Sequence, residues 1–203
     1  MIAALLLGSA AVAAEPIHPE RWINKGYHQS GLVRSDVSGV MRFRLTIASD
    51  GRTIRCEIPL SSGVVGFDAH ICALLTARAA FHPARNGQDM PAFAIYEGRA
   101  ALRGLRKRPS ISTAADYIVK LQRFPLGLGI GGIVSVVLDI DAAGKILNCQ
   151  VNPETDSKKA DAKLGAVACQ QASALDPDPV FDGDGKPVAT VRDINVGFKI
   201  DGA

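Results

Sequence analysis

The segment from Phe43 to Arg85 recurs in a diverged form in the second half of the chain. The two copies align without a gap over their most regular part. The aligned pairs are Met41 with Val134, Phe43 with Val136, Leu45 with Leu138, Ile47 with Ile140, Gly51 with Gly144, Ile54 with Leu147, Cys56 with Cys149 and Ile58 with Val151. A repeat of this length is the signature of a duplicated structural unit. The sequence therefore predicts two similar modules.

Within the first copy, apolar and polar residues alternate over residues 41–47 and again over 54–58, with a turn at residues 48–51. Alternation of this kind predicts an antiparallel hairpin with one buried face. From Phe67 the apolar spacing becomes helical, and a third, weaker strand is expected over residues 93–102.

The second copy predicts the same elements in the same order. Strands are expected over residues 134–140 and 147–151, a helix from about Asp161 to Ala172, and a last strand over residues 194–200 with an irregularity at Arg192–Asp193. We therefore expect an α+β fold of two tandem small modules, each an antiparallel three-stranded sheet with a helix on one face. The expected boundaries are residues 15–102 for the first module with an irregular lead-in anchored by Trp22, 103–115 for a linker and 116–203 for the second module.

Residues 1–14, MIAALLLGSAAVAA, are small and aliphatic and end in a pattern that signal peptidases cleave. We expect a signal peptide cut after Ala13 or Ala14 and no stable membrane span afterwards, because the run is too short to cross a bilayer as a helix. The basic residues that usually precede such a run are absent, which leaves a truncated start or a short uncleaved anchor open.

Export favours disulfides for the four cysteines. The repeat suggests the pairs Cys56 with Cys72 and Cys149 with Cys169, one within each module. Metal binding or thiol chemistry with His70, and free buried thiols, are the alternatives. The second module contains no histidine, so a metal or thiol site explains one copy at best.

Other motifs carry less weight. Gly127–Gly132 matches GxGxxG, but a dinucleotide site needs a helix after the glycines, and a strand is expected there. Four aspartates at positions 176, 178, 182 and 184 are not followed by the glutamate that closes a calcium loop, so a solvated hairpin is favoured. The basic residues Arg103, Arg106, Lys107 and Arg108 could touch an anionic surface, but we interpret them as a solvated linker.

Charge and motifs also limit the function classes. The first half has an excess of Lys and Arg and the second an excess of Asp and Glu, so no nucleic-acid footprint is expected. Neither GxSxG nor HExxH occurs. We therefore expect no catalytic residues, no metal and no cofactor.

The stretch FRLTIASDGRTIRCEIPLSSGVVGFDAHICALLTARAAFHPAR resembles the C-terminal domain of the TonB energy transducers, in particular cysteine-bearing forms from alphaproteobacteria. The second copy, with IVSVVLDIDAAGKILNCQV, LGAVACQQA, GKPV and INVGFKI, is similar but weaker. The resemblance implies a three-stranded sheet with helices on one face, no enzymatic activity, and binding of an extended segment at a sheet edge. The transmembrane anchor and proline-rich spacer of true transducers are missing from this sequence, which argues against force transduction.

The resemblance places the binding edges on residues 92–102 and 194–200. The expected partner-binding residues are Phe93, Ile95, Ile194, Val196, Phe198 and Ile200. The expected function is a periplasmic, non-enzymatic binding or scaffold protein of a Gram-negative envelope. Its partner would be a segment of an envelope protein, such as an outer-membrane transporter, or peptidoglycan. The alternative is a periplasmic enzyme or metal-handling protein that uses His70, His82 and the cysteines.

Overall fold

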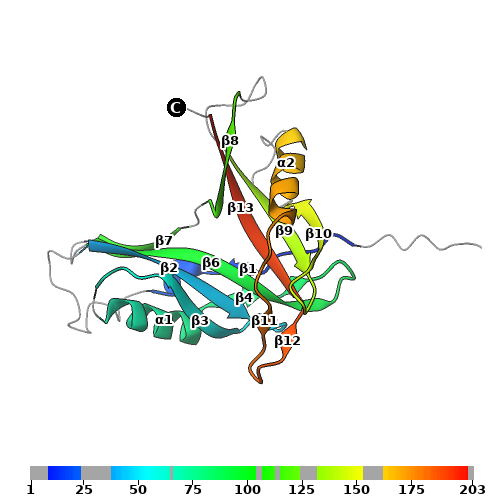
Figure 1. Ribbon diagram of the computed structural model, residues 1–203. Coiled ribbons are helices and arrows are strands. Elements are labelled where there is room, and N and C mark those ends of the chain that lie inside the picture. The colour runs from blue at the N-terminus through cyan, green and yellow to red at the C-terminus, as the bar shows by residue number, and fades with distance from the viewer. Residues whose placement is uncertain are drawn as a thin grey trace, which may run out of the picture.

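A computed structural model describes residues 9–23, 38–64, 66–103, 107–112, 115–123, 132–152 and 162–200 (Figure 1). The first half contains β1 (Glu15–Ile17), η1 (Pro19–Arg21), β2 (Ser38–Ile47), β3 (Thr53–Leu60), α1 (Phe67–Arg78), β4 (Ala80–His82), β5 (Ala84–Arg85) and β6 (Pro91–Arg103). Then follow β7 (Lys107–Ser112), β8 (Tyr117–Leu121), β9 (Gly132–Ile140), β10 (Ile146–Val151), α2 (Ala162–Ser173), β11 (Val180–Phe181), β12 (Pro187–Val188) and β13 (Thr190–Ile200).

Each half repeats one arrangement. In the first half the strand order is β3-β2-β6, and in the second it is β10-β9-β13, with antiparallel pairing between all neighbours. A helix follows the second strand of each half. The predicted hairpins, both helices and both third strands are thus confirmed.

The expectation of two separate three-stranded modules is wrong, because the two sheets are joined. Strand β13 pairs in parallel with β6 over three residue pairs, Thr190 with Phe93, Val191 with Ala94 and Arg192 with Ile95. The result is a mostly β structure with one continuous mixed sheet in the order β10-β9-β13-β6-β2-β3. We call these three pairs the seam.

The two helices cover opposite faces of this sheet. Residues paired across neighbouring strands point to the same face, so the register can be followed through the seam. Leu45 pairs with Tyr96 and Ala94 with Val191, which places Val191 on the α1 face. The next apolar residue of β13, Ile194, has the opposite parity and packs with α2.

Each half therefore has its own core. Phe43, Leu45 and Ile47 pack with Phe67 and Ile71 of α1. The second cluster joins alternate residues of β9 and β13 to α2: Val134, Val136, Leu138, Ile140, Leu164, Ala168, Ala172, Ile194, Val196 and Phe198. Val137 of β9 and Val191 of β13 belong to the first cluster, so the strands beside the seam are buried on both faces.

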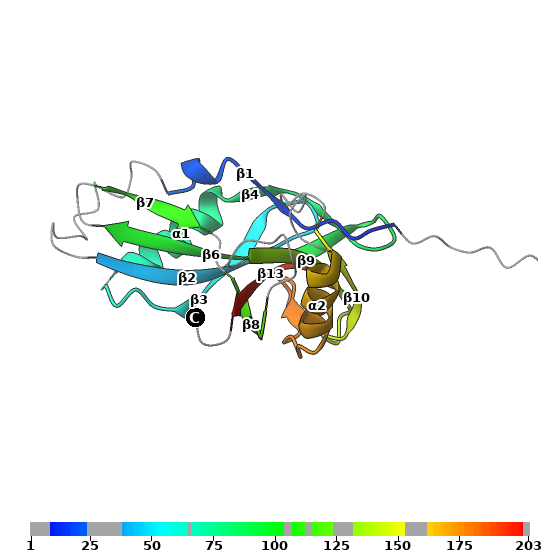
Figure 2. The ribbon, with the colours of Figure 1, turned by 90° about the horizontal axis from the view of Figure 1, so that it is seen from above.

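The N-terminal segment packs on the α1 side. Strand β1 pairs with β4, and both lie on the side of the sheet away from α2 (Figure 2). Trp22 is 2% exposed, contacts the rings of Phe81 and Tyr96, and its indole N–H donates to the carbonyl of Ile17 at 2.9 Å, so the expected apolar anchor is confirmed. Ala11, in the expected signal peptide, is buried in the same core.

The expected linker over residues 103–115 contains a strand. From the seam, β6 and β13 diverge into two arms (Figure 1). Beyond the seam, β7 pairs antiparallel with β6 and β8 pairs parallel with β13. The segment between the halves therefore adds one strand to each arm. Where β6 and β13 diverge, each has an unpaired edge that such a strand can occupy.

Charged residues fill the fork where the arms separate. Glu97 of β6 accepts hydrogen bonds from Arg44 and Arg192, each at 2.8 Å, and from Arg42 at 3.3 Å. Asp116, just before β8, accepts from Arg42 at 3.2 Å and from the backbone N–H of Asn195. Burial raises the pKa of Asp116 and lowers that of Arg192. We call Glu97, Asp116, Arg42, Arg44 and Arg192 the fork cluster. It links both halves and the segment between them.

We predict that Glu97→Gln destabilises the protein, because three guanidinium groups lose the carboxylate that offsets their charge. The Glu97 side chain is 13% exposed and its partners 20–32% exposed, so we expect a loss of about 2–3 kcal/mol in the free energy of unfolding. Urea denaturation measures it. Glu57→Gln is the control: this exposed carboxylate has no ion pair within the described residues, and its loss should change stability by about 0.5 kcal/mol or less.

A second partly buried acid, Asp193, lies on the α1 face of β13. Its carboxylate accepts hydrogen bonds from the hydroxyl of Ser135 and the amide of Asn152. Burial nevertheless raises the pKa of Asp193 above its ordinary value of 3.8. Burial also raises the pKa of the neighbouring Tyr96, with a smaller contribution from the charge of Asp193.

The pKa of Asp193 predicts a pH dependence of stability. A carboxyl group with a raised pKa favours the folded state below pH 3.8, and this contribution is lost as the pH rises through the folded-state pKa. We expect Asp193→Asn to have a higher melting temperature than the natural chain at pH 7, with the difference shrinking as the pH falls toward 4. Thermal melts of both chains across this range measure it. A constant difference across the range would contradict the prediction.

Candidate functional site at the outer edge of the sheet

Three of the six residues expected to form binding edges have a paired strand on both sides. Ile95 pairs with Thr46 on one side and Arg192 on the other. Val196 and Phe198 likewise have β9 on one side and β8 on the other. A partner strand would need these backbone groups unpaired, so the described pairing leaves no open edge at these three residues.

The remaining three expected residues pair on one side. Phe93 pairs with β13, Ile194 with β9 and Ile200 with β8. Phe93 belongs to the seam, Ile194 follows it along β13, and Ile200 lies at the end of an arm. Tertiary pairing of the third strands with each other, and with β7 and β8, is the physical reason for the difference from the sequence-based expectation.

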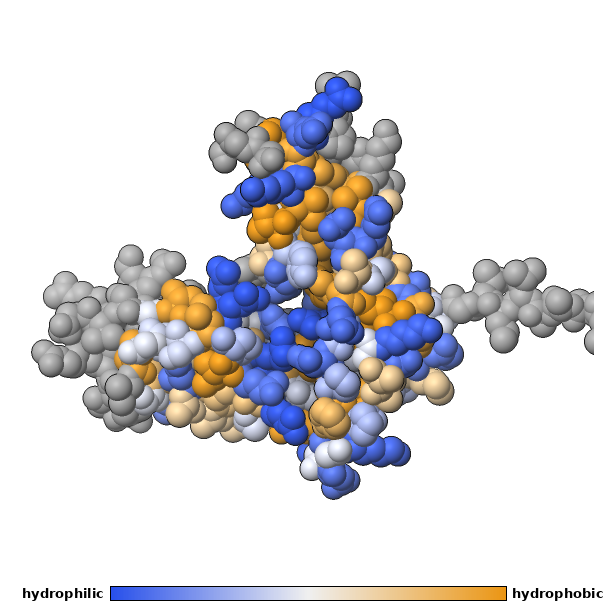
Figure 3. All heavy atoms as spheres, in the orientation of Figure 1, coloured by the Kyte–Doolittle hydropathy of each residue, from blue (hydrophilic) through white to orange (hydrophobic). Residues whose placement is uncertain are grey.

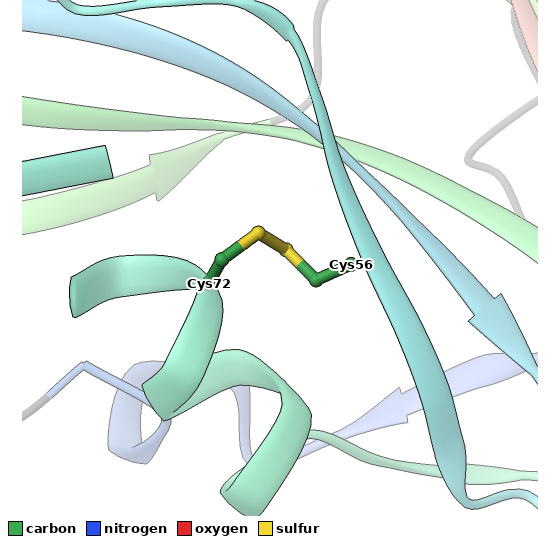
Figure 4. Close-up of a disulfide and its surroundings, with 2 residues drawn as sticks. All are labelled: Cys56 and Cys72. Carbon is green, nitrogen blue, oxygen red and sulfur yellow. A yellow bond between two sulfur atoms is a disulfide. The ribbon is translucent and has the colours of Figure 1, made fainter. Parts of the chain in front are cut away.

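The outermost strands of the sheet are instead β3 and β10. Each is the second strand of its half and has one partner, β2 or β9. Each is also held to the helix of its half by a disulfide: Cys56 of β3 to Cys72 of α1 (Figure 4), and Cys149 of β10 to Cys169 of α2. The Cα–Cα distance is 5.6 Å in both. The predicted pairing is therefore confirmed, and no cysteine is free.

Strand β10 presents backbone groups outward. The N–H of Asn152 donates to the carbonyl of Ser135, toward β9. Because backbone groups alternate in direction along an antiparallel strand, those of Gln150 also point to β9. The N–H and C=O of Cys149 and Val151 then point away from it, along the outer edge.

An open groove runs between this edge and α2. Its volume is about 450 Å³, and Ile146, Leu147, Asn148, Ala166, Gln170 and Ser173 contribute to its lining. Leu147 stands at a register shift in β10 and is 58% exposed. Among the described residues of this lining, none has a charged side chain.

The edge of β3 is less suited to pairing. It contains Pro59, which has no N–H to donate, and proline is a common device that blunts an edge strand. Leu60 ends this strand and is 54% exposed, much like Leu147. The two outer strands thus share their disulfides and an exposed leucine but differ in their capacity for backbone pairing.

The other sequence motifs give no competing site in the described part of the chain. His70 lies on α1 and His82 on β4, and neither belongs to a group of three or more potential metal ligands there. Asp182 caps the turn between β11 and β12 by accepting from the backbone N–H groups of Asp184 and Lys186. The GxGxxG stretch lies outside the described residues except for Gly132, which begins β9.

No family model, curated protein or solved structure matches this chain. Among the described helices, none has the length and apolar character needed to cross a membrane. The site must therefore be interpreted from its own geometry.

We predict that the disulfide of the second half holds β10 on the sheet. Replacing Cys149 and Cys169 by serine removes a cross-link with a sequence separation of 20 and should lower the free energy of unfolding by about 3 kcal/mol. In native-state hydrogen exchange, the Gln150 N–H, which points to β9, should exchange faster. The Cys56→Ser/Cys72→Ser variant is the matched control, since it should leave Gln150 unchanged. Unchanged exchange in both variants would refute the assigned role.

Proposed function

We propose that this protein is an exported, non-enzymatic binding protein that holds an extended segment of another envelope protein along the outer edge of β10. The observation that supports this most is the outward-facing N–H and C=O groups of Cys149 and Val151 beside the groove against α2. An added strand would satisfy these groups with its own backbone. This is the mode that the TonB resemblance implies, at a different strand.

The geometry accounts for both affinity and selectivity. Each backbone hydrogen bond contributes about 0.5–1.5 kcal/mol net. Four such bonds at Cys149 and Val151 therefore give a moderate binding affinity that does not depend on the partner's sequence. Alternate side chains of the bound strand would point into the groove. Because the groove lining is uncharged, we expect the partner to place small or apolar uncharged residues there.

The disulfides support a location outside the reducing cytoplasm. We assign the protein to the periplasm, where the signal peptide expected at residues 1–14 would direct it; the burial of Ala11 favours retention of this segment in the folded chain. The disulfides also favour binding, because an edge strand that is fixed to its helix loses less conformational entropy when a partner pairs with it.

Two other functions are less well supported. Peptidoglycan carries carboxylates, and the described lining of the β10 groove offers no cation to meet them. An enzyme or metal carrier built on His70, His82 and cysteine thiols lacks the thiols, because all four cysteines are in disulfides. A protein segment therefore remains the favoured partner at this edge.

The test uses a photo-crosslinking residue in place of Leu147, in living cells, to capture the partner segment. A synthetic peptide of that segment is then titrated against the isotope-labelled protein. We expect slower hydrogen exchange at the N–H groups of Cys149 and Val151. We also expect Leu147→Asp to weaken binding by about tenfold or more, since it removes an apolar contact and places a charge in the groove.

Leu60 provides the matched control because it is a leucine of nearly equal exposure on the other outer strand. Leu60→Asp should leave binding of the peptide unchanged, and a crosslinker at position 60 should not capture the same segment. Equal capture at both positions, or unchanged exchange at Cys149 and Val151, would show that β10 is not the binding edge.

A further inference from the structure

A second cavity lies on the opposite side of β13 from the β10 groove. Its volume is about 520 Å³, within the range of about 300–1,000 Å³ that small-ligand sites occupy. It lies where the first half meets β8, the seam and the segment after α2. Figure 3 shows hydrophilic side chains gathered there, where the two arms meet.

Guanidinium groups form the floor of this cleft. Arg44 of β2, Arg55 of β3 and Arg192 of β13 all line it. The register places them on one face, because Arg55 pairs with Thr46, Thr46 with Ile95, and Ile95 with Arg192. No helix covers this face of the first half, since α1 packs on the other side.

Two of the three guanidinium groups are held by Glu97, and the floor retains free donors. Glu97 fixes Arg44 through its Nε and Arg192 through one Nη. Within the described residues, the Nη atoms of Arg44 have no hydrogen-bond partner and Arg55 has no ion pair. The fork cluster therefore acts as a support that orients two guanidinium groups without consuming all their N–H groups.

Carboxylates stand across the cleft from these cations. Asp176 and Asp178 lie in the segment between α2 and β11, and Pro177 and Pro179 restrict its backbone. Glu57 of β3 pairs directly with Arg44 of β2, so it adds one carboxylate to the floor itself. None of the three carboxylates forms an ion pair with Arg44, Arg55 or Arg192 in the described structure, although all line one cavity. The carboxylates of Asp176 and Asp178 thus come from a different element than the guanidinium groups and line the same space with them, which is large enough for a ligand.

Two aromatic side chains flank the same space. Tyr117 begins β8 and is 43% exposed, and Phe181 of β11 is 40% exposed. Aromatic rings exposed at a cleft provide apolar contact area for a ligand at a small entropic cost. The cleft therefore combines a cationic floor, an anionic rim and an apolar flank.

We propose that this cleft binds a short zwitterionic peptide of two or three residues. The terminal carboxylate would accept hydrogen bonds from Arg44 and Arg55, the terminal ammonium group would donate to Asp176 or Asp178, and an apolar side chain would contact Tyr117 and Phe181. Carboxylate–guanidinium bonds are among the strongest polar contacts in proteins. This site is independent of the edge of β10, and its occupation would fill the space at the meeting point of the two arms.

The test is isothermal titration calorimetry of the whole chain with alanyl-leucyl-alanine in four forms: free termini, acetylated N-terminus, amidated C-terminus, and both ends blocked. We expect the free peptide to bind and each single block to weaken binding by about tenfold or more. Arg55→Gln should remove the penalty for amidating the C-terminus. The double variant Asp176→Asn/Asp178→Asn should remove the penalty for acetylating the N-terminus.

Matched controls lie near the cleft but outside its lining. Arg99→Gln, on the same face of β6, and Asp184→Asn, in the β11–β12 turn, should bind the free peptide like the natural chain. Leu147→Asp should also bind it normally, which separates this site from the β10 edge. The proposal is overturned if the free peptide does not bind at millimolar concentration, if the doubly blocked peptide binds equally well, or if the control variants lose as much affinity as the cleft variants.

Discussion

The contact between Glu97 and its guanidinium partners is the interaction on which the joined architecture depends most. Only three residue pairs connect β6 to β13 before the strands diverge, and the backbone pairing there is too short to fix the angle between the arms. One carboxylate binds Arg44 from the first half and Arg192 from the second, at 2.8 Å each. The fork cluster therefore sets the relation of the halves, and with it the shape of the cleft.

Local periodicity was sufficient for the repeated elements but not for β7 and β8 or for the assembly of the sheet. Alternation and helical spacing predicted both hairpins and both helices, and the repeat predicted the disulfides. The seam escaped prediction because a strand buried on both faces has no simple alternation. The irregularity expected at Arg192–Asp193, between the apolar residues Val191 and Ile194, is absent, because the pairing with β9 runs through without a shift. They simply face different cores.

The edge that we propose for binding differs from the edge expected from the sequence for a related reason. A resemblance to a single module marks the third strand as the free edge, yet in this chain each third strand has the other as neighbour. The sequence did contain a usable signal: once the third strands are paired, the second strand of each hairpin must be outermost. Pro59 in one such strand, and no proline in the other, then distinguishes β3 from β10. The cleft depends on side chains from six separate strands and a loop, which no local pattern brings together.

Parallel pairing of equivalent strands, with helices on opposite faces, has a consequence in terms of symmetry. A rotation by 180° about an axis that lies in the sheet and runs along the seam converts one half into the other: it keeps strand direction and exchanges the faces. The chain is thus a covalently linked pseudo-dimer with a self-complementary interface of the kind found in C2 homodimers. The sequences of the two copies differ, so the symmetry is not exact: Glu97 of β6, for example, binds arginines of both halves. A functional site on one half therefore need not exist on the other.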